Sequence, residues 1–121
     1  MYKRQVQTEI EGSSERPNPL LACEMERDLR ARMYQGVGIV RDAGSLRSTL
    51  RALDHLATRA RYNVGLQRMI ATGRSIAEAA LRRCESRGTH YRRDFPLTDP
   101  RCAQRLPSRG AALAFGSFAA R

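Results

Sequence analysis

The sequence has 121 residues, enough for one small domain, and its hydrophobic content of 41% is typical of a folded protein. Its formal net charge is +10, and nearly all of the positive charge comes from arginine because Lys3 is the only lysine. The arginines are spread along the whole chain and aromatic residues are few. This distribution favours solvated helix surfaces over a nucleic-acid-binding patch.

The cysteines and the hydropathy pattern exclude several other classes. Cys23, Cys84 and Cys102 are odd in number, widely spaced and without a Cys-x-x-Cys pair, which argues against a disulfide framework and a structural zinc site. No run of 18 apolar residues is present, so we expect no membrane span. We therefore expect a cytoplasmic protein.

The two ends of the chain differ from its middle. Residues 1–19 are polar and rich in Gly, Ser and Pro, which predicts a linker or ragged N-terminal end. Residues 101–121 are rich in Ala, Gly, Ser and Arg without a clear period, which predicts a flexible tail. The folded domain is expected at residues 20–100, and we expect the chain itself to be a fragment.

Three segments with the spacing of amphipathic helices follow one another in the middle of the chain. Their expected apolar stripes are Leu21, Met25, Leu29 and Met33; then Leu46, Leu50, Leu53, Leu56 and Ala57; then Leu66, Met69, Ile70, Gly73, Ile76, Ala77, Ala80, Leu81 and Cys84. Asp42 or Ser45 is the expected cap of the second helix, and residues 61–65 the turn before the third. Short links between helices predict an all-α fold, an antiparallel three-helix bundle.

Three further local expectations concern packing. Gly73 inside a helix costs about 1 kcal/mol relative to alanine, so we expect another helix to pass close to it. The apolar link at residues 37–40 is expected to be buried. Cys84, at the end of the third stripe, is expected to be a buried thiol.

The residues after the third helix, 85–96, form a segment that we call the strap. Gly88 is expected to end the helix in a left-handed conformation, and Pro96 bars a return to helix. An extended chain between them would alternate its side chains. The expected arrangement places His90, Arg92 and Asp94 on one side and Thr89, Tyr91 and Arg93 on the other.

Arg87, His90, Arg92 and Asp94 are the candidate functional residues of the strap. Three interpretations are open: the strap hydrogen-bonds back to the bundle, it forms a contact with a second domain, or His90 acts directly in catalysis. The sequence shows no catalytic constellation, no phosphate-binding glycine loop and no metal-binding helix motif. The predicted site is an interdomain contact, with no catalytic, cofactor-binding or metal-binding residue assigned.

The strap also carries a family resemblance. Its residues match the Glu-Ser-Arg-Gly-x-His-x-Arg-x-Asp-aromatic-Pro signature of the succinate dehydrogenase, fumarate reductase and L-aspartate oxidase flavoproteins, and the sequence between Met33 and Arg41 resembles the helix-to-helix connection of that family. The resemblance covers about residues 20–100. The sequence Val37–Arg41 and the tyrosine at position 91 are closer to the L-aspartate oxidase branch of this family.

The resemblance implies a role inside a larger enzyme. It implies a C-terminal helical domain of an oxidoreductase that uses FAD, with the flavin-binding and capping domains of the parent enzyme as partners. In this family the FAD fold and the substrate-binding residues lie in earlier domains, so the fragment alone is expected to bind no cofactor and to be inactive. The alternatives are the equivalent domain of a succinate dehydrogenase or fumarate reductase, and a small basic helical binding protein.

Overall fold

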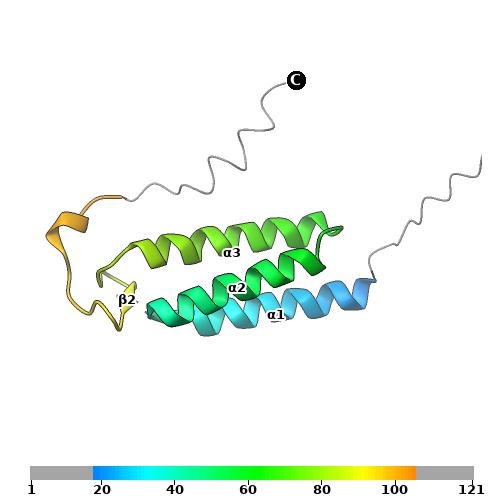
Figure 1. Ribbon diagram of the computed structural model, residues 1–121, viewed down its shortest axis with the longest axis horizontal. Helices are drawn as coiled ribbons and strands as arrows, with labels where there is room; N and C mark the ends of the chain where they lie inside the picture. Colours follow the sequence, from blue (N-terminus) through cyan, green and yellow to red (C-terminus); the bar gives the residue numbers. More distant parts are fainter. Residues whose placement is uncertain (1–17, 106–121) are drawn as a thin grey trace, which may run out of the picture.

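The computed structural model describes residues 18–105, and three helices make up most of this part of the chain (Figure 1). They are α1 (Pro19–Val37), α2 (Ala43–Arg59) and α3 (Val64–Arg82). Two short strands, β1 (Val40–Arg41) and β2 (Tyr91–Arg92), and the 3-10 helix η1 (Pro100–Cys102) complete the described elements. The helical class predicted from the sequence is confirmed, whereas the strand pair was not predicted.

The expected linker and tail fall mostly on residues 1–17 and 106–121, which lie outside the described part of the chain. The described residues at their borders are structured, since Pro19 begins α1 and residues 100–102 form η1. None of the helices in residues 18–105 is both long and apolar enough to cross a membrane.

Side-chain caps set where each helix begins. The side chain of Asn18 accepts a hydrogen bond from the backbone N–H of Leu20 at 3.0 Å, and that of Asn63 accepts from Leu66 at 3.0 Å. At α2, Asp42 Oδ1 accepts from the N–H of Ser45 at 2.8 Å, and Ser45 Oγ accepts from the N–H of Asp42 at 3.3 Å. This capping box satisfies amides that have no partner within the helix. The predicted cap is confirmed, with both candidate residues taking part.

The core consists of two apolar clusters at opposite ends of the bundle. One contains Met25, Leu29, Leu53, Leu56, Ala60, Leu66 and Ile70, and the other contains Val37, Leu46, Ala77 and Ala80. The first cluster joins the beginning of α1, the end of α2 and the beginning of α3. The second joins the end of α1, the beginning of α2 and the end of α3. Figure 1 shows the three helices side by side, with the strap at the end where α3 stops.

Most positions of the predicted stripes are buried, with exceptions at the periphery. Leu21 is 43% exposed and Ile76 is 47% exposed. Cys84 is exposed rather than buried, because α3 ends at Arg82 and the thiol is no longer on the helical stripe. The expectation for the link at 37–40 is wrong for Ile39 and Val40, which are 67% and 49% exposed.

Two glycines allow the helices to approach closely. A Cβ atom at Gly73 would lie 3.1 Å from Met33 Sδ and 3.5 Å from Leu53 Cδ1, which confirms the close passage expected there. The constraint is tighter at Gly36 of α1, where a Cβ atom would overlap Thr49 Oγ1 of α2. Both residues are buried, so the Thr49 side chain cannot turn into solvent to make room for an added methyl group.

We predict that Gly36→Ala lowers the free energy of unfolding by about 1 to 3 kcal/mol, because the added methyl group overpacks the contact with Thr49. Chemical denaturation followed by circular dichroism measures this change. The matched control is Gly65→Ala, at an exposed position where the nearest atom to a new Cβ is Asn63 Oδ1 at 3.5 Å. The control is expected to be neutral or stabilising by up to about 1 kcal/mol. Equal effects of the two changes would contradict the packing argument.

Candidate functional site

The strap begins with a tight hairpin and not with a helix end. The backbone N–H of Arg87 donates to the carbonyl of His90 at 2.8 Å, and the N–H of His90 donates to the carbonyl of Arg87 at 3.0 Å. Gly88 lies inside this turn with φ of +58°, a left-handed conformation that glycine adopts without steric cost. The expected left-handed glycine is therefore present, but the prediction that it ends the helix is wrong, because α3 ends at Arg82.

After the hairpin, the strap pairs with the link between α1 and α2. Strands β1 and β2 are parallel, with Val40 opposite Tyr91 and Arg41 opposite Arg92. The predicted alternation holds at Tyr91 and Arg92, but the prediction of an extended chain on either side is wrong, because Thr89, Arg93 and Asp94 lie in turns. Arg92 is only 1% exposed, whereas Tyr91 and Arg93 on either side of it are exposed.

Arg92 closes the C-terminal end of α3. Its Nη1 atom donates to the carbonyl oxygens of Ala80, Leu81 and Arg83 at 3.0, 3.0 and 3.2 Å. These carbonyls have no amide partner within the helix, and the end of the helix carries partial negative charge. A buried guanidinium thus provides both the hydrogen bonds and the positive charge that a helix C-terminus requires.

The other edge of the same guanidinium binds Asp94. Nε and Nη2 of Arg92 donate to Oδ1 and Oδ2 of Asp94, both at 2.7 Å. Asp94 Oδ2 also accepts from the backbone N–H of Ala43, in the first turn of α2, at 3.0 Å. The Arg92 guanidinium and this amide hold the pKa of Asp94 well below its ordinary value, and the carboxylate raises the pKa of Arg92. The pair therefore connects the end of α3 with the beginning of α2, each charge facing the helix terminus of opposite sign.

His90 connects the strap to the end of α1. Its Nδ1 atom lies 2.6 Å from Nη1 of Arg41, and its Nε2 atom lies 3.2 Å from the carbonyl oxygen of Arg83. A guanidinium can only donate and a carbonyl can only accept, so the ring is neutral with its proton on Nε2. Arg41 Nε in turn donates to the carbonyl of Gly38 at 2.6 Å, at the end of α1. Burial, together with the charges of Arg41, Arg92 and Arg83, lowers the pKa of His90.

A second charge cluster surrounds Glu85, which is fully buried. Its carboxylate accepts from Nη1 of Arg83, from Nε and Nη2 of Arg87 at 3.1 and 3.2 Å, and from the backbone N–H of Asp99 at 2.8 Å. The hydrogen bonds from Arg87 are the largest cause that lowers the pKa of Glu85 to about 2. The sequence placed Glu85 near the candidate residues but did not indicate that it would be a buried centre. The signal available in the sequence was an arginine two residues before Glu85 and another two residues after it, since both can bind its carboxylate.

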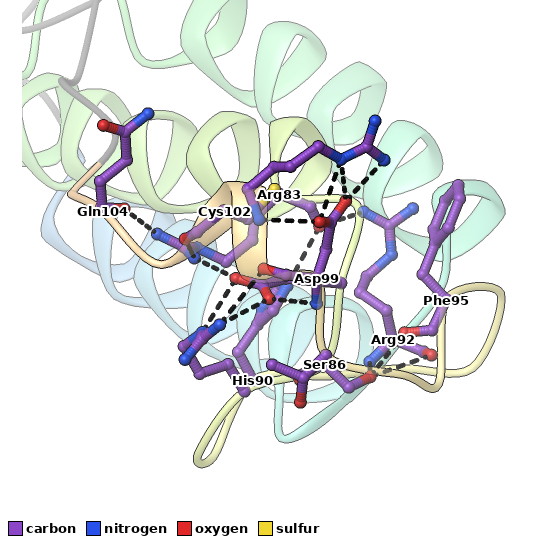
Figure 2. Close-up of polar contacts among 12 residues, drawn as sticks. Arg83, Ser86, His90, Arg92, Phe95, Asp99, Cys102 and Gln104 are labelled. Atoms are coloured by element: carbon purple, nitrogen blue, oxygen red, sulfur yellow. Dashed lines mark hydrogen bonds and ion pairs between the residues drawn. The ribbon is translucent and has the colours of Figure 1, made fainter.

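Ser86 fixes the curvature of the strap. Its Oγ accepts from the backbone N–H of Arg92 at 2.8 Å and donates to the carbonyl of Phe95 at 2.8 Å (Figure 2). The ring of Phe95 packs with its centroid 5.0 Å from the guanidinium carbon of Arg92, within the range of a cation–π contact. One serine hydroxyl thus holds both sides of the bend between residues 86 and 95.

The bonds of Arg83 extend the ordered structure past the strap. Figure 2 shows this side chain reaching to the backbone of Cys102 and Gln104, and its Nη1 and Nη2 atoms donate to their carbonyl oxygens at 2.9 and 3.0 Å. The first residues of the expected tail are therefore attached to the end of α3.

These contacts settle where the four candidate residues point. Arg87, His90, Arg92 and Asp94 are brought together at one end of the bundle, and each bonds to atoms of this chain. A carboxylate with a strongly lowered pKa is a weak base at neutral pH, and both ring nitrogens of His90 are engaged. Within residues 18–105, no group of three or more His, Cys, Asp or Glu side chains is arranged to hold a metal ion. The geometry is that of a structural clamp.

Comparison with known proteins identifies the type of domain. The profile described as "Fumarate reductase flavoprotein C-term" matches residues 62–106, which include α3 and the whole strap. The chain is 42% identical over 87 residues to an L-aspartate oxidase of Rhodospirillum rubrum, and 38% identical over 84 residues to one of Caulobacter vibrioides. The chain belongs to the succinate dehydrogenase and fumarate reductase flavoprotein family, as a C-terminal domain.

The matches cover much of this chain and a smaller part of its relatives. They span 72% and 69% of this chain, but 31% of the Rhodospirillum rubrum protein and 16% of the Caulobacter vibrioides protein. A fumarate reductase (CoM/CoB) protein of Methanothermobacter marburgensis is 29% identical over 119 residues, covering 81% of this chain and 22% of that protein. No solved structure matches the chain.

The flavoprotein family implies FAD in the parent enzyme, and the arginines that build the clamp are already engaged within this chain. The buried guanidinium of Arg92 has all three nitrogens bonded to oxygens of its own chain. Arg83 and Arg87 are likewise bonded to Glu85. We therefore assign no step of flavin chemistry to the residues of this domain.

We predict that Arg92→Lys destabilises this flavoprotein domain by about 3 kcal/mol, because lysine keeps the charge but cannot bind Asp94 through two nitrogens and the helix carbonyls through a third. Thermal and chemical denaturation measure the change. Arg93→Lys is the matched control, since the neighbouring arginine is exposed, and its effect is expected to stay within about 0.5 kcal/mol. A similarly small effect at both positions would show that the hydrogen bonds of the buried Arg92 guanidinium are not needed for stability.

We predict a loss of stability as the pH falls below the ordinary His pKa of 6.5, because the folded state lowers the pKa of His90. Above 6.5 the ring is neutral in both states and its contribution is complete; below it the unfolded chain takes up the proton first, and stability declines until the pH passes the folded pKa. Unfolding curves between about pH 7 and pH 5 measure this slope. It should flatten in His90→Gln and persist in His55→Gln, a change at an exposed position of α2. Equal slopes in the two variants would exclude His90 as the source.

Proposed function

We propose that this chain is the C-terminal antiparallel three-helix domain of an FAD-dependent L-aspartate oxidase, the enzyme that oxidises L-aspartate to iminoaspartate in NAD biosynthesis. The names and identities of the matched relatives support this assignment, since L-aspartate oxidases match at 42% and 38% and the fumarate reductase protein at 29%. The proposed partners are the flavin-binding and capping domains of the same enzyme, and the proposed location is the cytoplasm.

Within this enzyme the domain acts as a brace. The observation that carries this role is the Arg92–Asp94 pair, which holds the end of α3 against the beginning of α2. His90 and Arg41 attach the end of α1 to the same point. Ends of all three helices are thereby fixed in one rigid surface, and the charged groups that build it are engaged with one another and not with a substrate.

The equivalent domain of a fumarate reductase or succinate dehydrogenase is the second candidate. The match to the fumarate reductase protein extends over a larger share of this chain, 81%, than the matches to the two oxidases. A basic binding protein has less support. Several surface arginines in the described part are paired with carboxylates, among them Arg30 with Glu26 and Arg32 with Asp28.

Two chimeric enzymes distinguish the first two candidates. In one, this chain replaces the aligned segment of the Caulobacter vibrioides L-aspartate oxidase; in the other, it replaces the aligned segment of the Methanothermobacter marburgensis fumarate reductase protein. We expect the oxidase chimera to retain FAD and oxidise L-aspartate, and the oxidase without this segment to lose FAD. The fumarate reductase chimera should remain unstable.

Purification yield, bound FAD and turnover are the measurements. Equal recovery in both chimeras would support the family and overturn the assignment to L-aspartate oxidase. An oxidase chimera that behaves like the truncated enzyme would overturn the bracing role itself.

A further inference from the structure

The side of the strap that faces away from the helices carries apolar side chains. The register of the strand pair places Val40 beside Tyr91, and these side chains point away from the buried Arg92 because strand residues alternate. Val40 is 49% exposed and Tyr91 is 42% exposed, and the adjoining Ile39 is 67% exposed. Three large apolar side chains thus lie exposed on one short ribbon, a composition typical of an interaction site.

Arg93 stands next to these residues and differs from the other arginines of the strap. It follows Tyr91 by two positions, begins the turn that ends the strand pair, and is exposed. Arg87 and Arg92 are paired with Glu85 and Asp94, whereas the ion pairs of the described part of the chain include none to Arg93. We call Val40 and Tyr91, together with the exposed Ile39 and Arg93 beside them, the outer face.

The backbone beneath the outer face is held rigidly. The N–H of Tyr91 donates to the carbonyl of Ile39 at 3.2 Å, and the N–H of Arg93 donates to the carbonyl of Arg41 at 2.7 Å. The buried side chain of Arg92 anchors the residue between them. A surface that is already ordered loses little conformational entropy when it binds a partner, which favours docking.

We propose that the outer face docks onto a folded protein surface with an apolar centre and carboxylates at its edge. This inference rests on the proposed function, in which that surface belongs to the flavin-carrying part of the same enzyme. Charge selects this occupant over a second copy of the chain, because the chain has a net charge of +10 and two copies would bring their Arg93 side chains together. An acidic edge would instead supply the carboxylate that Arg93 lacks within the described residues.

The strap thus has two sets of residues with different roles. Arg87, His90, Arg92 and Asp94 shape the strap from the inside, and the outer face makes the contact between domains. The contact predicted from the sequence motif is thereby moved from the motif residues to the positions between and beside them.

Hydroxyl-radical footprinting of the oxidase chimera tests the proposal directly. The oxidation of Tyr91 and Ile39 is compared between the free 121-residue chain and the chimera, with Tyr62 as the internal reference. Tyr62 is 67% exposed and lies between α2 and α3, at the other end of the bundle. We expect a several-fold loss of oxidation at Tyr91 and Ile39 in the chimera and no change at Tyr62.

A pair of matched double variants in the chimera provides the second measurement. Tyr91→Ser with Arg93→Glu alters the outer face, and Tyr62→Ser with Arg61→Glu makes the same changes at the far end, where Arg61 stacks 4.7 Å from the ring centroid of Tyr62. The outer-face variant should release FAD roughly tenfold faster, as expected for the loss of an interface anchor, and the far-end variant should match the unmodified chimera. Circular dichroism of each variant in the free chain checks folding.

The outcomes separate this inference from the proposed function. If the unmodified chimera retains FAD but Tyr91 remains as reactive as in the free chain, or the two double variants behave alike, the outer face is not the docking surface and the bracing role stands. If the unmodified chimera loses FAD like the truncated enzyme, both proposals fall. Self-association of the free chain that the outer-face variant abolishes would identify a second copy as the occupant and overturn the inference.

Discussion

The pair of hydrogen bonds between the Arg92 guanidinium and the Asp94 carboxylate is the interaction on which the rest of the structure depends. A buried guanidinium is costly to remove from water, and it is tolerated here because each of its nitrogens meets an oxygen. The acceptors are of two kinds, a carboxylate and the unpaired carbonyls at the end of α3. The carboxylate then meets an unpaired amide at the start of α2. Groups that would each be unfavourable if buried alone are favourable together.

Arginine side chains bind the terminal carbonyls of α1 and α3, where the cap residues Gly38 and Arg83 are extended and not left-handed. Arg41 donates to backbone carbonyls at the end of α1, and Arg92 does so at the end of α3. Because the carbonyls are satisfied from outside the helix, the chain can leave each helix in an extended conformation. The exit of α1 leads directly into β1, whereas the chain that leaves α3 first makes the hairpin at residues 87–90 and then forms β2, parallel to β1.

The helices and much of their packing could be predicted from the sequence, because these features depend on local spacing. Apolar periodicity located the core, Asp42 and Ser45 indicated the cap of α2, and Gly73 indicated a close helix. The end of α3 and the exposure of Cys84 could not be predicted in this way. They depend on the guanidinium of Arg92, which comes later in the chain. Nothing in the sequence of residues 82–84 indicates that this side chain binds there.

The same limit applies to the candidate site. Alternation along the strap correctly indicated that Arg92 and Tyr91 face opposite ways, since it requires only an extended chain. Two bonding partners of the strap, Arg41 and Ala43, lie far earlier in the chain, and the sequence carries no signal for that pairing. Family resemblance located the motif but not its orientation. The inward direction of the charged side chains emerges only when both segments are in place.

The distance in sequence between the two halves of the clamp has a consequence for the dynamics of the domain. Bonds between residues 41–43 and 90–94 close a long loop, and the entropy of that closure is recovered only after the helices between them have assembled. The clamp can therefore close only once the helices have assembled, and its closed bonds then hold the outer face in one conformation. The surface offered to a neighbouring domain is thus completed by the packing of all three helices, so recognition depends on the whole bundle and not on the strap alone.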